Sequence, residues 1–185
     1  MASLPRINTI THEEWLHIPE VTDFVEEVVN GEIRIAPPGN WKHAYILDYL
    51  HASLKNQLKG QPVRALASSL GLIIRKSPLI SRVPDIPVFR DEGEIELGGY
   101  LHSAPQLLVE VLSPANTPRE RQTKLDDYSA IGVPEVWIVS PEARTVEILR
   151  LQDGRLRTTA ILAEGLLKPA LFPGVQVDIV AIWPD

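Results

Sequence analysis

The chain has 185 residues, of which 44% are hydrophobic and 23% charged, a composition typical of a globular protein with a sizeable core. It contains no cysteine, which excludes disulfides, thiolate metal sites and cysteine nucleophiles. The formal net charge of −6 argues against a protein that coats or packages nucleic acid, but a nuclease needs only a local basic surface.

The sequence carries no sign of a membrane protein. No uncharged apolar run is long enough to span a bilayer, and no long apolar stretch follows Met1–Arg6. We therefore expect no signal peptide, no membrane contact and a cytoplasmic location. No repeat or linker stands out, so residues 1–185 are expected to form one domain.

The first part of the chain predicts a short helix, a hairpin and a long helix. Thr11 and Glu14 form a capping-box pattern, which indicates a helix that ends before Pro19. Residues 24–35 resemble a hairpin, because Asn30-Gly31 is typical of a two-residue turn. Apolar residues then recur at helical spacing over residues 41–59, up to Gly60.

Extended segments dominate the middle of the chain. Strands are expected at residues 63–67 and 72–75, followed by two apolar runs at 83–89 and 107–112. A polar loop over residues 91–99 separates these two runs.

The last part of the chain predicts a crossover unit and then antiparallel pairs. Thr117, Pro118 and Glu120 mark a helix start, and Gly132 marks its end. Strand 135–139 follows, so strands 107–112 and 135–139 should run parallel. Segments 145–151 and 155–162 flank an Asp153-Gly154 turn, and residues 171–183 alternate apolar and polar. The sequence therefore predicts an α/β fold with a mixed β-sheet flanked by helices.

Asp85 and Glu110 are lone carboxylates in the two apolar runs. An unpaired carboxylate in such a run is costly to desolvate, which suggests that the two share a partner. If the strands are adjacent, both side chains can converge on one divalent ion, since Glu110 shares a face with Leu108 and Leu112. Hard oxygen ligands favour Mg²⁺, with Mn²⁺ as a substitute, and such an ion can polarise a phosphoryl oxygen.

Lys124 is the third candidate for this site. On the predicted helix it lies on one stripe with Arg121, Leu125 and Tyr128. Because Leu125 and Tyr128 would pack on the sheet, Lys124 either points back to the Glu110 strand and stabilises a reacting phosphate, or extends into solvent from the edge of the helix.

Several segments resemble the Uma-type family of restriction-endonuclease-like proteins. The matching segments lie in the expected order over nearly the whole chain, and Glu110-Val111-Leu112-Ser113-Pro114 is the most specific of them. The others are 27–33, His43, 83–85, 124–128, 132–139 and 171–174.

The resemblance implies a PD-(D/E)XK nuclease fold over residues 1–185 and Mg²⁺-dependent cleavage of DNA. Asp85 and Glu110 become the metal ligands and, with Lys124, the catalytic residues. The lysine of the general motif would stand at Leu112, and in this family its role is thought to have moved to the following helix, where Lys124 lies.

Glu27 and His43 are weaker candidates for the same site. Glu27 either adds a carboxylate from the first hairpin or lies on an exposed edge. His43 either contacts substrate phosphate or the attacking water, or only caps and packs its helix.

Three functions remain open at this stage. The first is a Mg²⁺-dependent endodeoxyribonuclease, expected to be a homodimer if it cuts both strands. The second is an inactive nuclease-fold module that binds nucleic acid or protein. In the third, Asp85 and Glu110 are structural charges paired with Arg82, Arg75 or Lys124.

Overall fold

The structure is a computed structural model that describes residues 9–17, 25–36, 39–67, 70–91, 95–96, 99–114 and 116–184. Its helices are α1 (His12–His17), α2 (Trp41–Gln57), α3 (Pro118–Ala130) and the short 3₁₀ helix η1 (Val180–Ile182). None of the described helices is long and apolar enough to cross a membrane.

The strands form two six-stranded sheets and one pair. The central sheet has the order β12-β11-β10-β9-β6-β3, and its strands are β3 (Val63–Ala65), β6 (Ile86–Arg90), β9 (Leu107–Val111), β10 (Glu135–Ser140), β11 (Thr145–Gln152) and β12 (Arg155–Leu162). The second sheet has the order β2-β1-β5-β4-β8-β7, and its strands are β1 (Val25–Val29), β2 (Glu32–Ala36), β4 (Gly71–Lys76), β5 (Leu79–Arg82), β7 (Ile95–Glu96) and β8 (Tyr100–Leu101). The pair consists of β13 (Leu166–Leu167) and β14 (Val177–Asp178).

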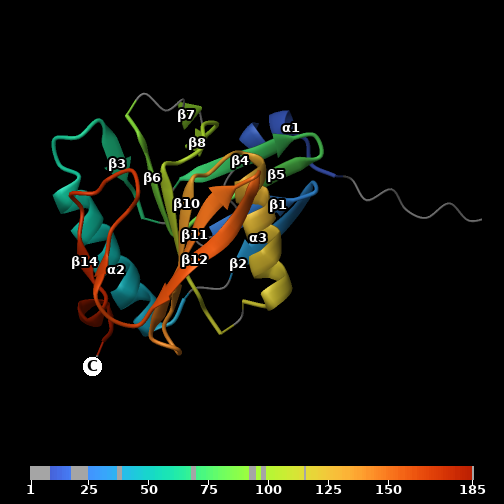
Figure 1. The fold of residues 1–185 in the computed structure, drawn as a ribbon. Coiled ribbons are helices and arrows are strands. Elements are labelled where there is room, and N and C mark those ends of the chain that lie inside the picture. Colours follow the sequence, from blue (N-terminus) through green and yellow to red (C-terminus); the bar gives the residue numbers. More distant parts are fainter. Residues whose placement is uncertain are drawn as a thin grey trace, which may run out of the picture.

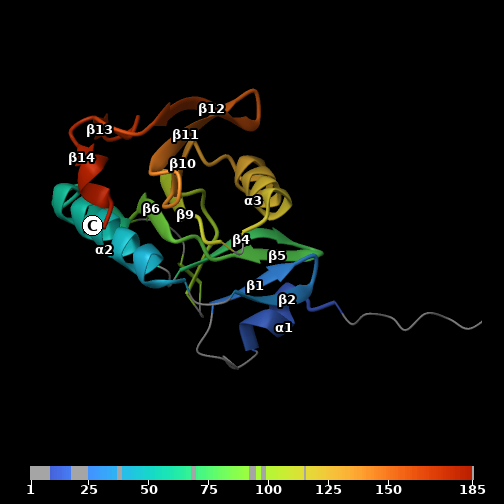
Figure 2. The same ribbon diagram turned by 90° about the horizontal axis from the view of Figure 1, so that it is seen from below.

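The central sheet lies between two helices (Figures 1 and 2). On one face Ile46, Leu50 and Leu54 of α2 pack against alternate residues of β6 and β9. On the opposite face Leu125 and Tyr128 of α3 join the cluster that contains residues from β9 and β10. The second sheet lies next to α3 and carries α1 on its far side (Figure 2). This arrangement confirms the predicted α/β fold with mixed sheets flanked by helices.

Local signals in the sequence are confirmed at the predicted positions. The capping boxes of α1 and α3 form: in α3, Thr117 Oγ1 accepts from the Glu120 amide while the Glu120 carboxylate accepts from the Thr117 amide. Asn30 and Gly31 both have positive φ, as the two-residue turn requires. Strands β9 and β10 run parallel across the α3 crossover. The predicted start of the hairpin at Phe24 and the residue Pro19 lie outside the described residues.

Three expectations about the strands were wrong. The strands divide into two large sheets instead of one. Strand β5 was not predicted, because four buried residues in a row, including Ser81 and Arg82, give no alternation of apolar and polar positions. The region expected to be one polar loop at 91–99 includes the two-residue strand β7.

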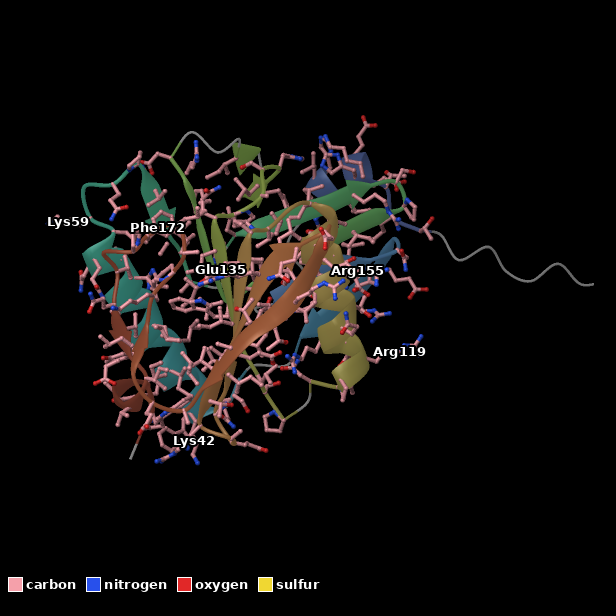
Figure 3. All side chains as sticks on the ribbon, in the orientation of Figure 1. Lys42, Lys59, Arg119, Glu135, Arg155 and Phe172 are labelled. Atoms are coloured by element: carbon pink, nitrogen blue, oxygen red, sulfur yellow. The ribbon has the colours of Figure 1, made fainter. Side chains whose placement is uncertain are left out.

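Among the residues that the structure describes, Glu135 is the most deeply buried carboxylate, with 2% of its surface exposed. Its oxygens accept from Trp137 Nε1 at 2.7 Å, Arg150 Nε at 3.2 Å and the Ala170 amide at 3.0 Å. In Figure 3 it lies in the middle of the molecule, well away from the ends of α2 that Lys42 and Lys59 mark. These bonds tie the central sheet to the segment that connects the two strands of the C-terminal pair, so Glu135 is a structural residue.

Replacing Glu135 with alanine should therefore destabilise the fold. The change leaves the buried Trp137 Nε1 and the Ala170 amide without their acceptor, so we expect the free energy of unfolding to fall by about 2–4 kcal/mol. Urea denaturation would measure this loss. The exposed Glu142, replaced in the same way, is the matched control, and equal small losses in both variants would contradict the structural role of Glu135.

Candidate functional site

The pairing of β6 with β9 brings Asp85 and Glu110 together. The two strands are antiparallel with Ile86 opposite Val109, so the residues just beyond this pair, Asp85 and Glu110, also lie opposite each other. Asp85 stands immediately before β6 rather than within it, and its Oδ2 accepts from the Val111 amide at 2.7 Å. A backbone donor of the neighbouring strand thus fixes the orientation of this carboxylate.

Glu110 lies on the α3 face of the central sheet with only 8% of its surface exposed. Its Oε1 accepts a hydrogen bond from the Tyr128 hydroxyl, and its Oε2 lies 3.2 Å from Lys124 Nζ. Burial, together with the charge of Asp85, raises the pKa of Glu110 to about 7, although Lys124 and Tyr128 oppose this shift. The positive charge of Lys124 therefore compensates the buried carboxylate only in part.

Lys124 lies between two carboxylates. Its Nζ is 3.1 Å from Glu27 Oε1 on β1 and 3.2 Å from Glu110 Oε2 on β9. Burial alone would lower the pKa of the amine, but the charges of Glu110 and Glu27 outweigh it and raise that pKa. Lys124 is therefore a fixed cation that points back to the Glu110 strand, and it does not extend into solvent.

Arg82 at the end of β5 holds the other side of Glu27. Its Nη1 donates to Glu27 Oε2 at 2.9 Å, and its Nε and Nη2 donate to Asp127 Oδ2 at 2.8 and 2.7 Å. Burial acts to raise the pKa of Glu27, but the charges of Lys124 and Arg82 and its hydrogen bonds lower it overall. Glu27 thus stays ionised and is buried, not exposed on the hairpin edge.

His43 approaches the site from the first turn of α2. Its amide is held by the helix cap Asn40 at 3.0 Å, and its Nε2 lies 3.4 Å from Asp85 Oδ2. The interaction with Asp85 raises the pKa of His43, although partial burial opposes it. The side chain therefore contacts a candidate metal ligand in addition to its place in the helix.

Formal charges indicate what the site can accommodate. The formal charges of Arg82 and Lys124 match those of Glu27 and Asp127, and the pair Asp85 and Glu110 adds two further carboxylates, with His43 beside Asp85. A divalent cation would neutralise this pair, and two carboxylates with added waters match the ligands that Mg²⁺ takes. Among the described residues no three or more His, Asp or Glu side chains form a group that could hold a metal ion on their own. The donor set thus fits an ion held by two protein carboxylates.

If Asp85 and Glu110 were purely structural charges, their expected partners were Arg82, Arg75 or Lys124, and the two arginines are wrong. Arg82 pairs with Glu27 and Asp127, and Arg75 bonds to Asn30 and to a backbone carbonyl; only Lys124 contacts Glu110. Leu112, where the general motif has its lysine, packs against the apolar cluster under α3. The amine that reaches Glu110 thus comes from the helix.

Three residues of the site were not recognised from the sequence as part of it. Tyr128 was expected only to pack, Asp127 was not singled out, and Arg82 was considered only as a partner for the wrong carboxylates. A usable signal was present for α3, because Asp127 and Tyr128 lie three and four residues after Lys124, about one turn further along the helix. Arg82 carried no such signal, since its partners are 55 and 45 residues away in the chain.

Comparisons with known proteins found one family model and a similar solved structure. The model of the Uma2 family, described as putative restriction endonuclease, matches residues 12–180. Among solved structures, a putative nuclease from Anabaena variabilis is similar, with 25% sequence identity and a TM-score of 0.77 over 94% of this chain and 97% of the other. A search of curated proteins found no match.

The raised pKa of Glu110 predicts a pH-dependent stability of the metal-free protein. The Glu110 carboxyl has a pKa of about 7 in the folded protein, compared with the ordinary value of 4.5 expected in the unfolded chain. Its contribution to the free energy of unfolding is therefore complete below about pH 4.5 and is lost as the pH rises through 7. The raised pKa of His43 acts in the same direction. Glu110→Gln should be more stable than the wild type by roughly 3 kcal/mol at about pH 8, and near parity at about pH 4.

Urea denaturation with a chelator present, at several pH values, measures this difference. A matched control is Asp91→Asn, because Asp91 is an exposed carboxylate paired with Arg64 outside the site. Parallel stability curves for the wild type and Glu110→Gln would contradict the raised pKa.

Proposed function

Because the chain belongs to the Uma2 family of putative restriction endonucleases, we propose that it is a metal-dependent endonuclease that hydrolyses phosphodiester bonds in DNA. The family and the nuclease-like structural neighbour both support a nuclease function in general. The observation that carries the finer proposal is that positions 85 and 110 lie opposite each other on paired strands, while Lys124 from α3 contacts Glu110.

The proposed metal ligands are Asp85 and Glu110, with Mg²⁺ as the ion and Mn²⁺ as a substitute. Such an ion, when bound, would supply positive charge to a phosphoryl oxygen and lower the pKa of a bound water. Val111 holds Asp85 through its amide, and Tyr128 holds Glu110 through its hydroxyl, so both carboxylates are oriented before an ion arrives. This preorganisation supports a metal-binding role.

Lys124 would act as a fixed positive charge, not as a base. Its raised pKa keeps the amine protonated at neutral pH, so it can donate hydrogen bonds to the substrate phosphate or orient the attacking water. His43, whose pKa is also raised, would donate a hydrogen bond to a phosphate oxygen from the other side of Asp85. Both residues would thus stabilise negative charge that develops on phosphorus-bound oxygens.

The remaining proposals concern assembly. We propose that residues 1–185 act as one domain and that two copies associate, since enzymes that cut both strands of a duplex commonly do so as symmetric dimers. Two copies would present two sites to the two strands. Light scattering of the wild-type protein with and without a short duplex would test this association.

Removing either proposed ligand should abolish metal-dependent cleavage without unfolding the protein. In Asp85→Asn and Glu110→Gln one negative charge of the pair is lost, so Mg²⁺ affinity should fall by at least about tenfold. Calorimetric titration with Mg²⁺ and cleavage of a DNA substrate mixture, with and without chelator, would measure the two effects.

The control variant is again Asp91→Asn, which should bind Mg²⁺ and cleave DNA as the wild type does. Cleavage retained in both site variants would refute the assignment of Asp85 and Glu110. Binding of DNA that is insensitive to chelator, with no cleavage under any condition, would instead favour an inactive module that binds nucleic acid.

A further inference from the structure

We propose that Glu27 is a positioning residue for Lys124 and not a metal ligand, and that Arg82 and Asp127 hold Glu27 in this role. The inference rests on the proposed function, in which Lys124 acts on the substrate phosphate.

Both oxygens of Glu27 already have donors. Oε1 accepts from the Val83 amide at 3.2 Å and lies 3.1 Å from Lys124 Nζ, while Oε2 accepts from Arg82 Nη1 at 2.9 Å. The side chain is buried, with 8% of its surface exposed. To bind an ion, Glu27 would have to give up its bonds to Arg82 Nη1 and to the Val83 amide, which is unfavourable for a buried group. Its carboxylate is therefore committed to its three donors.

Arg82 closes a loop of interactions that begins and ends on α3. It connects Glu27 to Asp127, and Asp127 lies three residues after Lys124, about one helical turn. The guanidinium is 5% exposed and offers a planar array of donors, so it fixes the two carboxylates relative to each other. The loop from Lys124 through Glu27 and Arg82 to Asp127 thus ties β1, β5 and α3 into one unit.

This loop of interactions restricts the position of the Lys124 amine. Lys124 has a long flexible stem, and its amine lies 3.2 Å from Glu110, a proposed metal ligand. With Glu110 as its partner alone, the amine would be free to swing about that carboxylate on its flexible stem. Glu27 provides a second negative partner, with Oε1 3.1 Å from Nζ. The amine is then held at one position beside Glu110.

An experiment that does not depend on activity tests the geometry. The chain has only six lysines, and among them Lys124 makes partly buried ion pairs with Glu27 and Glu110. In protein carrying isotope-labelled lysine, an ordered, protected amine gives a sharp NMR signal, whereas exposed amines exchange rapidly with water. We expect one sharp signal that disappears in Lys124→Met, which assigns it, and that is lost or broadened in Glu27→Gln and weakened in Asp127→Asn.

Matched controls use the neighbouring residue in each case. Glu26→Gln places the same change on the opposite face of β1, and Asp126→Asn places it on the exposed side of α3. Both controls should keep the signal. The amide NMR spectrum shows whether Glu27→Gln folds. If it does not fold, the Lys124 signal of Asp127→Asn is compared with that of the wild type instead. An unchanged Lys124 signal in the folded variants would overturn the proposal.

Metal binding and kinetics separate a positioning residue from a ligand. In Glu27→Gln we expect the Kd for Mg²⁺ to stay within about twofold of the wild type, whereas kcat falls by about tenfold or more with little change in KM. A loss of Mg²⁺ affinity comparable to that in Asp85→Asn would overturn the proposal. If the wild-type protein cleaves no DNA, the proposed function fails, but the NMR comparison still decides whether Glu27 positions Lys124.

Discussion

The site depends on how the fold compensates negative charge that it buries. Glu110 is placed by β9 on an inner face of the central sheet, where water is largely excluded and the ionised form is disfavoured. Each contact around it reduces that penalty: the Tyr128 hydroxyl on one oxygen and the Lys124 amine on the other. The compensation is incomplete, since the pKa of Glu110 remains raised to about 7. A buried carboxylate whose charge is only partly compensated, beside a second carboxylate, is the electrostatic condition that favours binding of a divalent cation.

The chain topology explains why these groups meet. The parallel crossover from β9 through α3 to β10 returns the helix over the strand that precedes it, which places Lys124 and Tyr128 above Glu110. The antiparallel partner β6 brings Asp85 to the end of the same strand. The second sheet, which lies next to α3 (Figure 2), then adds Glu27 and Arg82. Segments that are far apart in the sequence thus meet because the strand pairings and one crossover are fixed.

Local chemistry was readable from the sequence, whereas pairing over long distances was not. The capping boxes and the Asn30-Gly31 turn depend on neighbours within a few residues, so their patterns sufficed. A lone carboxylate in an apolar strand does not by itself indicate a metal ligand. Glu135 also begins an apolar strand, yet its oxygens accept hydrogen bonds from Trp137, Arg150 and the Ala170 amide. What separates the two is the partner set, which comes from segments that the sequence alone does not bring together.

Moving the lysine from the strand to the helix changes what the site requires. A lysine at position 112 would be positioned by β9 itself, but Leu112 instead adds to the apolar cluster that α3 covers. Lys124 is correctly placed only while α3 is docked on that cluster through Leu125 and Tyr128. The core on the other face, around Leu50 and Leu54 of α2, is separate from this contact. Loosening of α3 would therefore remove the cation and the Tyr128 hydrogen bond from Glu110 while the α2 side of the sheet stays packed. The link from Asp127 through Arg82 to Glu27 opposes such loosening, because it anchors α3 to the second sheet by buried, charged hydrogen bonds.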